Sequence, residues 1–241
     1  IIDTHSNTPA VNMGNLAYFA SKKVNGVAAL HTKILHNRVF AKFNELLPGK
    51  LVNETNGVTQ RRFLLKANPL LSGLITELIG DKWITDLSEL AKLRQYQDNE
   101  EVLERLLDIK QHNKLELTRL IKEKYPIRDE HGVKIRTAQI NPHSTFNVQI
   151  KRVHEYKRQI MNALHILMLY NEIKNNPHKK ITPRTFIFAS KAAPSYHEAK
   201  KIIHFINILA NKINNDPAIK GLIRIAFLEN YNVSLAEKIV P

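Results

Sequence analysis

The sequence predicts an α/β fold in which a parallel sheet, flanked by helices, follows a mainly helical segment. Three apolar runs of strand length, over residues 145–152, 184–190 and 221–230, alternate with two long amphipathic stretches, 155–176 and 195–216. Short strands that alternate with long helices are typical of βαβ units, whose strands run parallel and whose crossovers are right-handed. The first strand places Val148 and Ile150 in the predicted core.

In the region before the predicted sheet, glycine residues interrupt the helical pattern and mark turns. Residues 11–47 alternate apolar and polar residues at roughly helical spacing, with a predicted break at Asn25-Gly26. Residues 47–63 contain the turn dipeptides PG and NG, so this stretch is expected to be largely loop.

Helical periodicity returns over residues 63–125, with Pro69 and Gly80 as punctuation. Trp83 lies among leucine and isoleucine residues and is predicted to be buried. Residues 126–144 are polar and rich in turn formers, which predicts an exposed hairpin or loop. A further helix is expected to begin at about residue 233.

The composition narrows the classes of partner. Lys plus Arg number 36 against 22 Asp plus Glu, which gives a net charge of +14 and suggests an anionic partner. The charge is scattered along helices, so nucleic-acid binding is not favoured. Cysteine is absent, the eleven histidines show no metal-ligand spacing, and no signal peptide or membrane span is recognisable. No metal site is therefore predicted.

Polar and basic side chains gather where the three predicted strands end. Ligands of an open parallel sheet bind outside the carboxyl ends of its strands, and helix N-termini there favour anions. The junctions after the strands bring together Lys151, Arg152, His154, Tyr156, Lys157, Lys191, Tyr196, Glu229, Asn230 and Tyr231. This set predicts an anion pocket, most simply for phosphate, with groups suited to a polyol nearby. No G-x-G-x-x-G or Walker loop is present, which argues against an ordinary dinucleotide or nucleoside triphosphate site.

The alternative for any single basic residue is that it has no role in binding a ligand. Arg158 and one of the lysines can equally face solvent or pair with Glu155. It is less favoured that none of the charges at the first junction binds a ligand, because these residues directly follow the end of a strand.

Several strings are highly specific. The segments "VNGVAALHTKIL", "ETNGVTQRRFLLKANPLLSGLI", "FNVQIKRVHEYKRQ", "SKAAPSYHEAK" and "IAFLENYNVSLAEKIVP" closely resemble the glycogen, starch and maltodextrin phosphorylases, in order and over essentially the whole chain. The resemblance implies part of a GT-B fold. Residues 1–56 would be the end of the N-terminal lobe and residues 57–241 the first half of a Rossmann-like C-terminal lobe.

The resemblance also implies an activity. Members of that family are cytoplasmic enzymes, usually homodimers, that cleave the terminal α-1,4-glucosyl unit of a glucan with inorganic phosphate and release α-D-glucose 1-phosphate. They use pyridoxal 5′-phosphate through its phosphate group and not as an electron sink. No membrane or nucleic-acid partner is expected.

Site residues follow from the matching positions. Arg152 and Lys157 would bind the substrate phosphate, and Lys151 would contact the cofactor phosphate. Tyr156 and Asn56 would hydrogen-bond the glucosyl unit. Val27 is counted with the substrate-binding residues and would approach the cofactor side of the cleft. Tyr231 would lie against the pyridoxal ring, Lys191 would support the cleft, and Phe63 and Val233 would also bind the cofactor. Two phosphates close together repel, so several cations and the bidentate fork of arginine suit such a site.

The chain departs from the family at Gln60, Phe63 and Asn232, where proline, tryptophan and arginine are usual, and residues 127–138 are expected to form a surface insertion. The glycine-rich segment that carries the family's cofactor lysine is not recognisable, and most of the N-terminal lobe is not represented. This chain alone is therefore expected to be inactive. Two other hypotheses remain: a non-catalytic βα module for a sugar phosphate or nucleotide, and a basic helical scaffold for nucleic acid or a protein.

Overall fold

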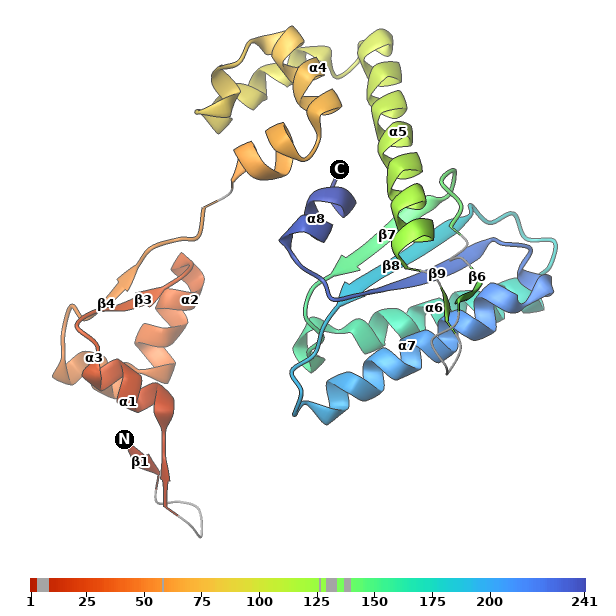
Figure 1. Cartoon of the computed structure of the whole chain (residues 1–241). Coiled ribbons are helices and arrows are strands. Elements are labelled where there is room, and N and C mark those ends of the chain that lie inside the picture. Colours follow the sequence, from red (N-terminus) through yellow and green to blue (C-terminus); the bar gives the residue numbers. More distant parts are fainter. Residues whose placement is uncertain (4–8, 58, 126, 129–133, 137–139) are drawn as a thin grey trace. The chain divides into compact units, whose positions relative to one another are not determined.

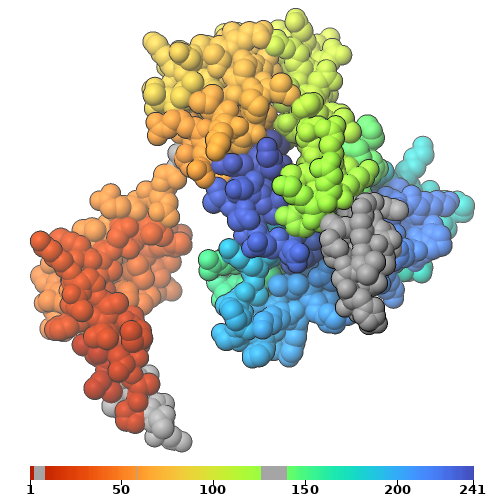
Figure 2. All heavy atoms as spheres, viewed as in Figure 1, coloured from red at the N-terminus to blue at the C-terminus, as the bar shows by residue number. Residues whose placement is uncertain are grey.

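The computed structural model describes residues 1–3, 9–57, 59–125, 127–128, 134–136 and 140–241. The chain divides into two compact units, Ile1–Thr59 and Gln60–Pro241. Figure 1 traces their backbones, and Figure 2 gives their heavy atoms. The assignment of residues 1–56 and 57–241 to two lobes stays a prediction.

The Ile1–Thr59 unit alternates short strands with short helices. Strands β1 and β2 pair antiparallel, whereas β3 and β4 pair in parallel with Val24 opposite Leu51. The predicted break at Asn25-Gly26 is confirmed, since both residues lie in β3. The prediction that residues 47–63 are largely loop misses β4, because its partner is a distant part of the chain. The described elements are β1 (Ile2–Asp3), β2 (Ala10–Val11), α1 (Met13–Ala20), β3 (Val24–Gly26), α2 (Ala29–Ile34), the π-helix η1 (Leu35–Val39), α3 (Ala41–Leu46) and β4 (Leu51–Asn53).

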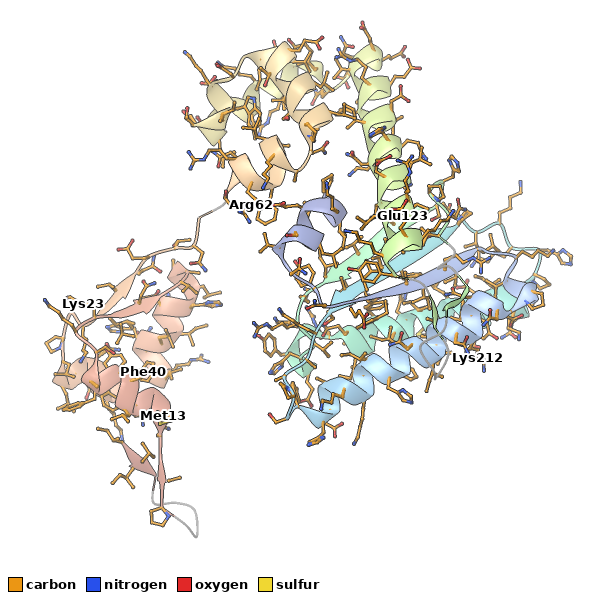
Figure 3. The ribbon with its side chains drawn as sticks, in the orientation of Figure 1. Met13, Lys23, Phe40, Arg62, Glu123 and Lys212 are labelled. Carbon is orange, nitrogen blue, oxygen red and sulfur yellow. The ribbon has the colours of Figure 1, made fainter. Side chains whose placement is uncertain are left out.

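Tyr18 is the centre of a small aromatic core in this unit. Its ring lies 4.6 Å from that of Phe40 and 5.3 Å from that of Phe43, between centroids, and only 1% of the residue is exposed. Phe40 is labelled in Figure 3. The Tyr18 hydroxyl donates to Asn44 Oδ1 at 2.6 Å, which satisfies the polar end of the buried ring. Helices α1 and α3 are thereby joined.

The Gln60–Pro241 unit begins with helices. Helix α4 is capped by the side chain of Asn68, which accepts from the Leu71 amide at 3.3 Å, and it ends at Gly80, whose φ of 80° suits glycine. Trp83 is fully buried and donates to Thr76 Oγ1 at 3.2 Å, as its predicted core position requires. The elements are the π-helix η2 (Arg61–Lys66), α4 (Pro69–Ile79), the 3₁₀ helices η3 (Lys82–Ile84) and η4 (Leu87–Tyr96), and α5 (Glu100–Lys124).

The stretch around Trp83 is helical but not α-helical. Asp86 has extended backbone and its carboxylate accepts from the Ser88 amide at 2.9 Å, so it caps the start of η4. Of the exposed hairpin or loop predicted for residues 126–144, the described residues have the hairpin pairing, because β5 (Ile127–Arg128) is antiparallel to β6 (Lys134–Arg136). The predicted surface insertion at residues 127–138 lies largely outside the described residues.

A three-stranded parallel sheet, in the order β7-β8-β9, forms the centre of this unit (Figure 1). The predicted parallel sheet flanked by helices is confirmed. Its strands are β7 (Thr145–Ile150), β8 (Arg184–Ser190) and β9 (Ile223–Glu229), and its helices are α6 (Gln159–Asn175), α7 (His197–Asn215) and α8 (Val233–Ile239), with short 3₁₀ turns η5 (Glu155–Lys157) and η6 (Pro217–Ile219).

Helices cover both faces of the sheet, as Figure 1 shows. On one face, Phe186 and Phe188 of β8 pack in a cluster with α6 and α7. On the other, Ile187 and Ala189 pack with residues of α5 and α8. Because side chains alternate along a strand, β8 is buried on both sides, which explains the continuous apolar run at residues 186–189.

Strand β7 lies at an edge of the described sheet, and this corrects one predicted core residue. Val148 is 44% exposed. Together with Ile150 it lines a cleft of about 610 Å³ beside α5 and α8. Periodicity shows which side of a strand is apolar, but how fully that side is covered depends on the neighbouring elements.

Candidate functional site

The chain beyond β7 stays attached to the sheet for three residues before it turns. The Lys151 amide donates to the Ala189 carbonyl, and the Val153 amide donates to the Lys191 carbonyl, both at 3.1 Å. Val153 is 3% exposed and belongs to the apolar cluster beneath α6 and α7. Lys151 and Arg152, which precede this buried anchor, are exposed. The anchor therefore places two cations at the carboxyl edge of the sheet.

A tight turn follows, and it moves the start of α6 away from the predicted position at residue 155. The 3₁₀ turn η5 contains Lys157, whose amide donates to the His154 carbonyl at 3.0 Å. Arg158 then adopts a left-handed backbone with φ of 63°, and α6 begins at Gln159. A non-glycine residue in this region is uncommon and is often found where a site is held in shape. Lys157 consequently lies in the loop and not on the helix.

Aromatic side chains lie beside these cations. Tyr156 is 69% exposed, and its ring centroid lies 4.1 Å from that of His154. Lys157 Nζ is 5.7 Å from the centre of the Tyr156 ring. The exposed phenol can offer a hydroxyl to a polar ligand next to the ammonium group, whereas His154 supports the ring.

The loop keeps its positive charge. None of the ion pairs between described residues involves Lys151, Arg152 or Lys157. The nearest acidic group in sequence, Glu155, instead accepts a hydrogen bond of 2.5 Å from the Tyr196 hydroxyl.

Tyr196 belongs to the loop after β8, so its bond to Glu155 joins two of the three strand-to-helix loops. That bond and partial desolvation raise the pKa of Tyr196. The alternative reading in which Glu155 pairs with Arg158 or a neighbouring lysine is not the arrangement found among the described ion pairs.

The other two loops reach the same edge. Lys191 is exposed directly after β8. Tyr231 follows β9 after Asn230, which has φ of 57°, and its amide donates to the Ser190 carbonyl at 3.5 Å. Val233 begins α8 and is 48% exposed. The structure thus brings these predicted site residues to the edge that carries the cations.

Phe63 belongs to a different element, which ion pairs tie to α8. It is half-buried in η2, and its neighbours Arg62 and Lys66 pair with Glu237 of α8 at 3.5 and 3.8 Å. Arg62 is labelled in Figure 3. Val27 and Asn56 belong to the Ile1–Thr59 unit, where the Asn56 amide donates to the Val27 carbonyl at 3.1 Å. The structure therefore joins these two residues to each other.

Two of the three residues at which the chain departs from the family pattern, Gln60 and Asn232, have structural roles. Gln60 donates through Nε2 to the Ile84 carbonyl at 2.7 Å, a bond that proline has no side-chain group to form. Asn232 caps α8, because its Oδ1 accepts from the Leu235 amide at 3.0 Å.

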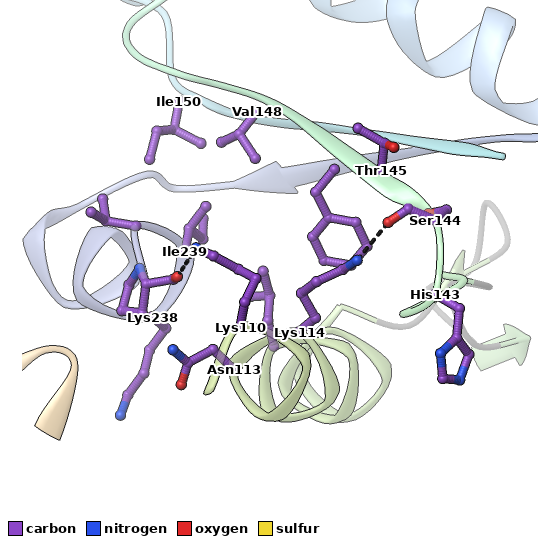
Figure 4. Close-up of a pocket in the computed structure, with 14 residues that line it drawn as sticks. Lys110, Asn113, Lys114, His143, Ser144, Thr145, Val148, Ile150, Lys238 and Ile239 are labelled. Carbon is purple, nitrogen blue, oxygen red and sulfur yellow. Dashed lines mark hydrogen bonds between the residues drawn. The ribbon is translucent and has the colours of Figure 1, made fainter. Parts of the chain in front are cut away.

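Figure 4 shows the cleft beside β7 with the residues that line it. No predicted site residue lines it. Lys114 of α5 donates to the Ser144 carbonyl at 2.6 Å there. Burial, with the nearby charge of Lys110, lowers the pKa of Lys114.

The described residues contain no cluster of three or more His, Cys, Asp or Glu side chains suited to a metal ion. Among the helices that the structure describes, none is long and apolar enough to cross a bilayer.

Comparison with known proteins identifies the family of the chain. A family profile described as carbohydrate phosphorylase matches residues 1–241. The chain belongs to that family. Curated relatives include the liver form of glycogen phosphorylase from Homo sapiens, 46% identical over 231 residues, and the muscle form from Oryctolagus cuniculus, 45% identical over the same length. Each alignment covers 96% of this chain and 26% of the relative, so the chain spans about a quarter of these phosphorylases.

Membership of the phosphorylase family confirms the resemblance read from the sequence and gives no support to a free-standing βα module or a basic scaffold. The roles of the individual site residues stay predictions. The sequence analysis did not predict that Gln149 and Gln159 donate side-chain hydrogen bonds to backbone carbonyls of the 151–157 loop. Gln149 within the strand and Gln159 on the inner side of a helix were the available signal, since polar residues at inward positions need hydrogen-bond partners.

Proposed function

We propose that this chain supplies the phosphate-binding loop of an α-glucan phosphorylase. The enzyme would cleave terminal α-1,4-glucosyl units with inorganic phosphate and release α-D-glucose 1-phosphate. The observation that carries the proposal is the 151–157 loop, which presents Lys151, Arg152 and Lys157 at the carboxyl edge of the sheet with no ion pair among the described residues. Unpaired cations at such an edge suit a multiply charged anion.

Each side chain of the loop has a separate task in this proposal. Arg152 and Lys157 hold the substrate phosphate, and the planar fork of Arg152 can bind two phosphate oxygens at once. Their fixed charge steadies the phosphate as positive charge develops on the sugar ring. Tyr156 and Asn56 hydrogen-bond the glucosyl unit. The glucan can be glycogen, starch or maltodextrin.

The residues present also fit pyridoxal 5′-phosphate. Lys151 is an exposed cation in the same loop, and Tyr231 is a half-buried aromatic ring in the loop after β9. Lys151 would bind the cofactor phosphate, and Tyr231 would lie against the pyridine ring, with Val27, Phe63, Lys191 and Val233 completing the surroundings. When bound, the cofactor supplies a phosphate group for proton transfer next to the substrate phosphate. The lysine that links the cofactor covalently is not assigned in this chain.

The wider architecture is part of the same proposal. The three-stranded sheet would belong to a Rossmann-like lobe of a GT-B fold, and residues 1–56 would belong to the end of the other lobe. The complete enzyme would be a cytoplasmic homodimer. The 241-residue chain alone would not turn over substrate.

The test compares the full-length protein that carries this chain with two variants. Wild type should release glucose 1-phosphate from an α-glucan and phosphate, and the 241-residue chain should not. Lys157→Met should raise KM for phosphate about 10- to 150-fold, the equivalent of a charged hydrogen bond worth about 1.5–3 kcal/mol. Lys180→Met removes an exposed lysine that precedes β8 at the opposite end of the sheet, and it should change nothing. A full-length protein that releases no glucose 1-phosphate from any of the three glucans contradicts the proposal.

A further inference from the structure

Three backbone carbonyls of the 151–157 loop are each held by an uncharged side chain. Ser190 Oγ donates to the Lys151 carbonyl at 2.7 Å. Gln159 Nε2 donates to the Arg152 carbonyl, and Gln149 Nε2 donates to the Lys157 carbonyl, both at 3.1 Å. The residues so held are the three cations assigned above to the two phosphates.

Gln159 is the most buried of these side chains. It is 1% exposed at the first position of α6. Besides its bond to the Arg152 carbonyl, its Oε1 accepts from the His154 amide at 3.4 Å. One side-chain amide therefore spans both flanks of the buried Val153. Loss of either bond would leave a polar group unsatisfied in the interior, which costs free energy, so both bonds are expected to persist.

The other two side chains are themselves held. Gln149 is half-buried in β7, and its Oε1 accepts from Asn162 Nδ2 of α6 at 2.9 Å. Ser190 is 3% exposed at the end of β8. Each bond therefore connects a packed strand or helix to the loop. These bonds restrict the motion of the loop relative to the sheet.

The loop requires such support. Three neighbouring cations without described ion pairs repel one another, and Arg158 adds a left-handed backbone that is unfavourable for a residue with a side chain. Acidic partners would steady the cations but would also neutralise the charge that an anion needs. Uncharged amide and hydroxyl groups that bind the backbone can fix the loop and leave the charge available.

We propose that Gln159 is a positioning residue for phosphate binding, assisted by Gln149 and Ser190. By holding the carbonyl of Arg152 and the amide of His154, it fixes the backbone from which Arg152 projects. The inference rests on the proposed function, because it takes phosphate as the ligand of these cations. A preorganised loop binds the anion without first having to be ordered.

The experiment uses the full-length protein and the variant Gln159→Met, which keeps the length of the side chain and removes both hydrogen bonds. Affinity for inorganic phosphate is measured by titration calorimetry, KM for phosphate and for glucan by steady-state kinetics, and stability by urea unfolding. We expect the phosphate Kd and KM to rise about tenfold, with KM for glucan within about twofold of wild type.

A matched control separates positioning from stability. Asn214 is another side-chain amide with two bonds to one stretch of backbone, since it donates to the Ile225 carbonyl at 2.8 Å and accepts from the Ile225 amide at 3.0 Å. It lies at the C-terminal end of α7, away from the loop. Asn214→Leu should lower the urea midpoint as Gln159→Met does and leave the phosphate Kd unchanged.

The outcomes decide between the possibilities. A Gln159→Met protein whose phosphate Kd stays within about twofold of wild type overturns the inference, as does an equal loss in Asn214→Leu. If Gln159→Met does not fold, Gln149→Met removes the bond to the carbonyl of Lys157, a residue assigned to the substrate phosphate, and should weaken phosphate binding about threefold; an unchanged phosphate Kd in that variant overturns the inference. Phosphate binding without glucose 1-phosphate release defeats the proposed function but leaves the Kd comparison valid. A wild-type protein that binds no phosphate overturns both.

Discussion

Gly26 offers a sharp test of the packing that positions Val27 and Asn56. A Cβ atom at residue 26 would lie 2.0 Å from Thr32 Oγ1 and 2.8 and 2.9 Å from Thr32 Cβ and Cα. The Thr32 hydroxyl cannot simply move, because it lies 2.9 Å from the Ala28 carbonyl and 2.6 Å from Asn53 Oδ1. The Cα is backbone of α2, so Gly26→Ala must push that helix away from β3.

The expected cost is that of overpacking, about 1–3 kcal/mol of the unit's free energy of unfolding. Converted into an opening equilibrium, this predicts amide exchange of the β3 and β4 peptides about 5- to 150-fold faster than in wild type. The Gly26→Ala/Thr32→Ala double variant removes the contact with Oγ1 but keeps that with Cα. It should therefore be less destabilised than the sum of the two single variants.

Gly73 provides the matched control. It is exposed in α4, and an added Cβ would meet nothing within 4 Å. Gly73→Ala should stabilise its unit by about 0.5–1 kcal/mol, because alanine is the better helix former. Hydrogen exchange followed by mass spectrometry measures the local stability of both variants. Unchanged exchange at β3 and β4 in Gly26→Ala would refute the packing described for α2 against β3.

Two further predictions concern pH and capping. Hydrogen bonds from Tyr170, the backbone and Lys174 lower the pKa of Asp216 to about 2 from the ordinary 3.8. The ionised Asp216 carboxylate therefore stabilises the fold fully above about pH 4, and this contribution is lost as pH falls towards 2. In Asp216→Asn, the urea midpoint should fall less steeply over that pH range than in wild type. An equally steep fall would contradict the role assigned to Asp216. Asn232→Ala should cost about 0.5–2 kcal/mol in thermal unfolding by removing the cap of α8, whereas Asn232→Asp, which keeps an acceptor, should cost less.

Local pattern was sufficient for most of the fold of the second unit. The run of residues 184–190 was predicted as a strand and is β8, because a strand buried on both faces has few ways to appear in sequence other than as a continuous apolar run. The helix punctuation at Pro69 and Gly80 also corresponds to the ends of α4. Elements whose partners are distant were harder: β4 is three residues long and depends on pairing with β3.

The candidate site divides in the same way. The sequence by itself determined the family, the charge of the 151–157 loop and its place at the end of a strand, because these depend on residue identity and order. Only the tertiary structure decided that α6 begins at Gln159, that Glu155 bonds to Tyr196, and that three uncharged side chains hold the loop. Such bonds join residues from different elements, and no local periodicity records which side chain will meet which carbonyl once the strands and helices have packed.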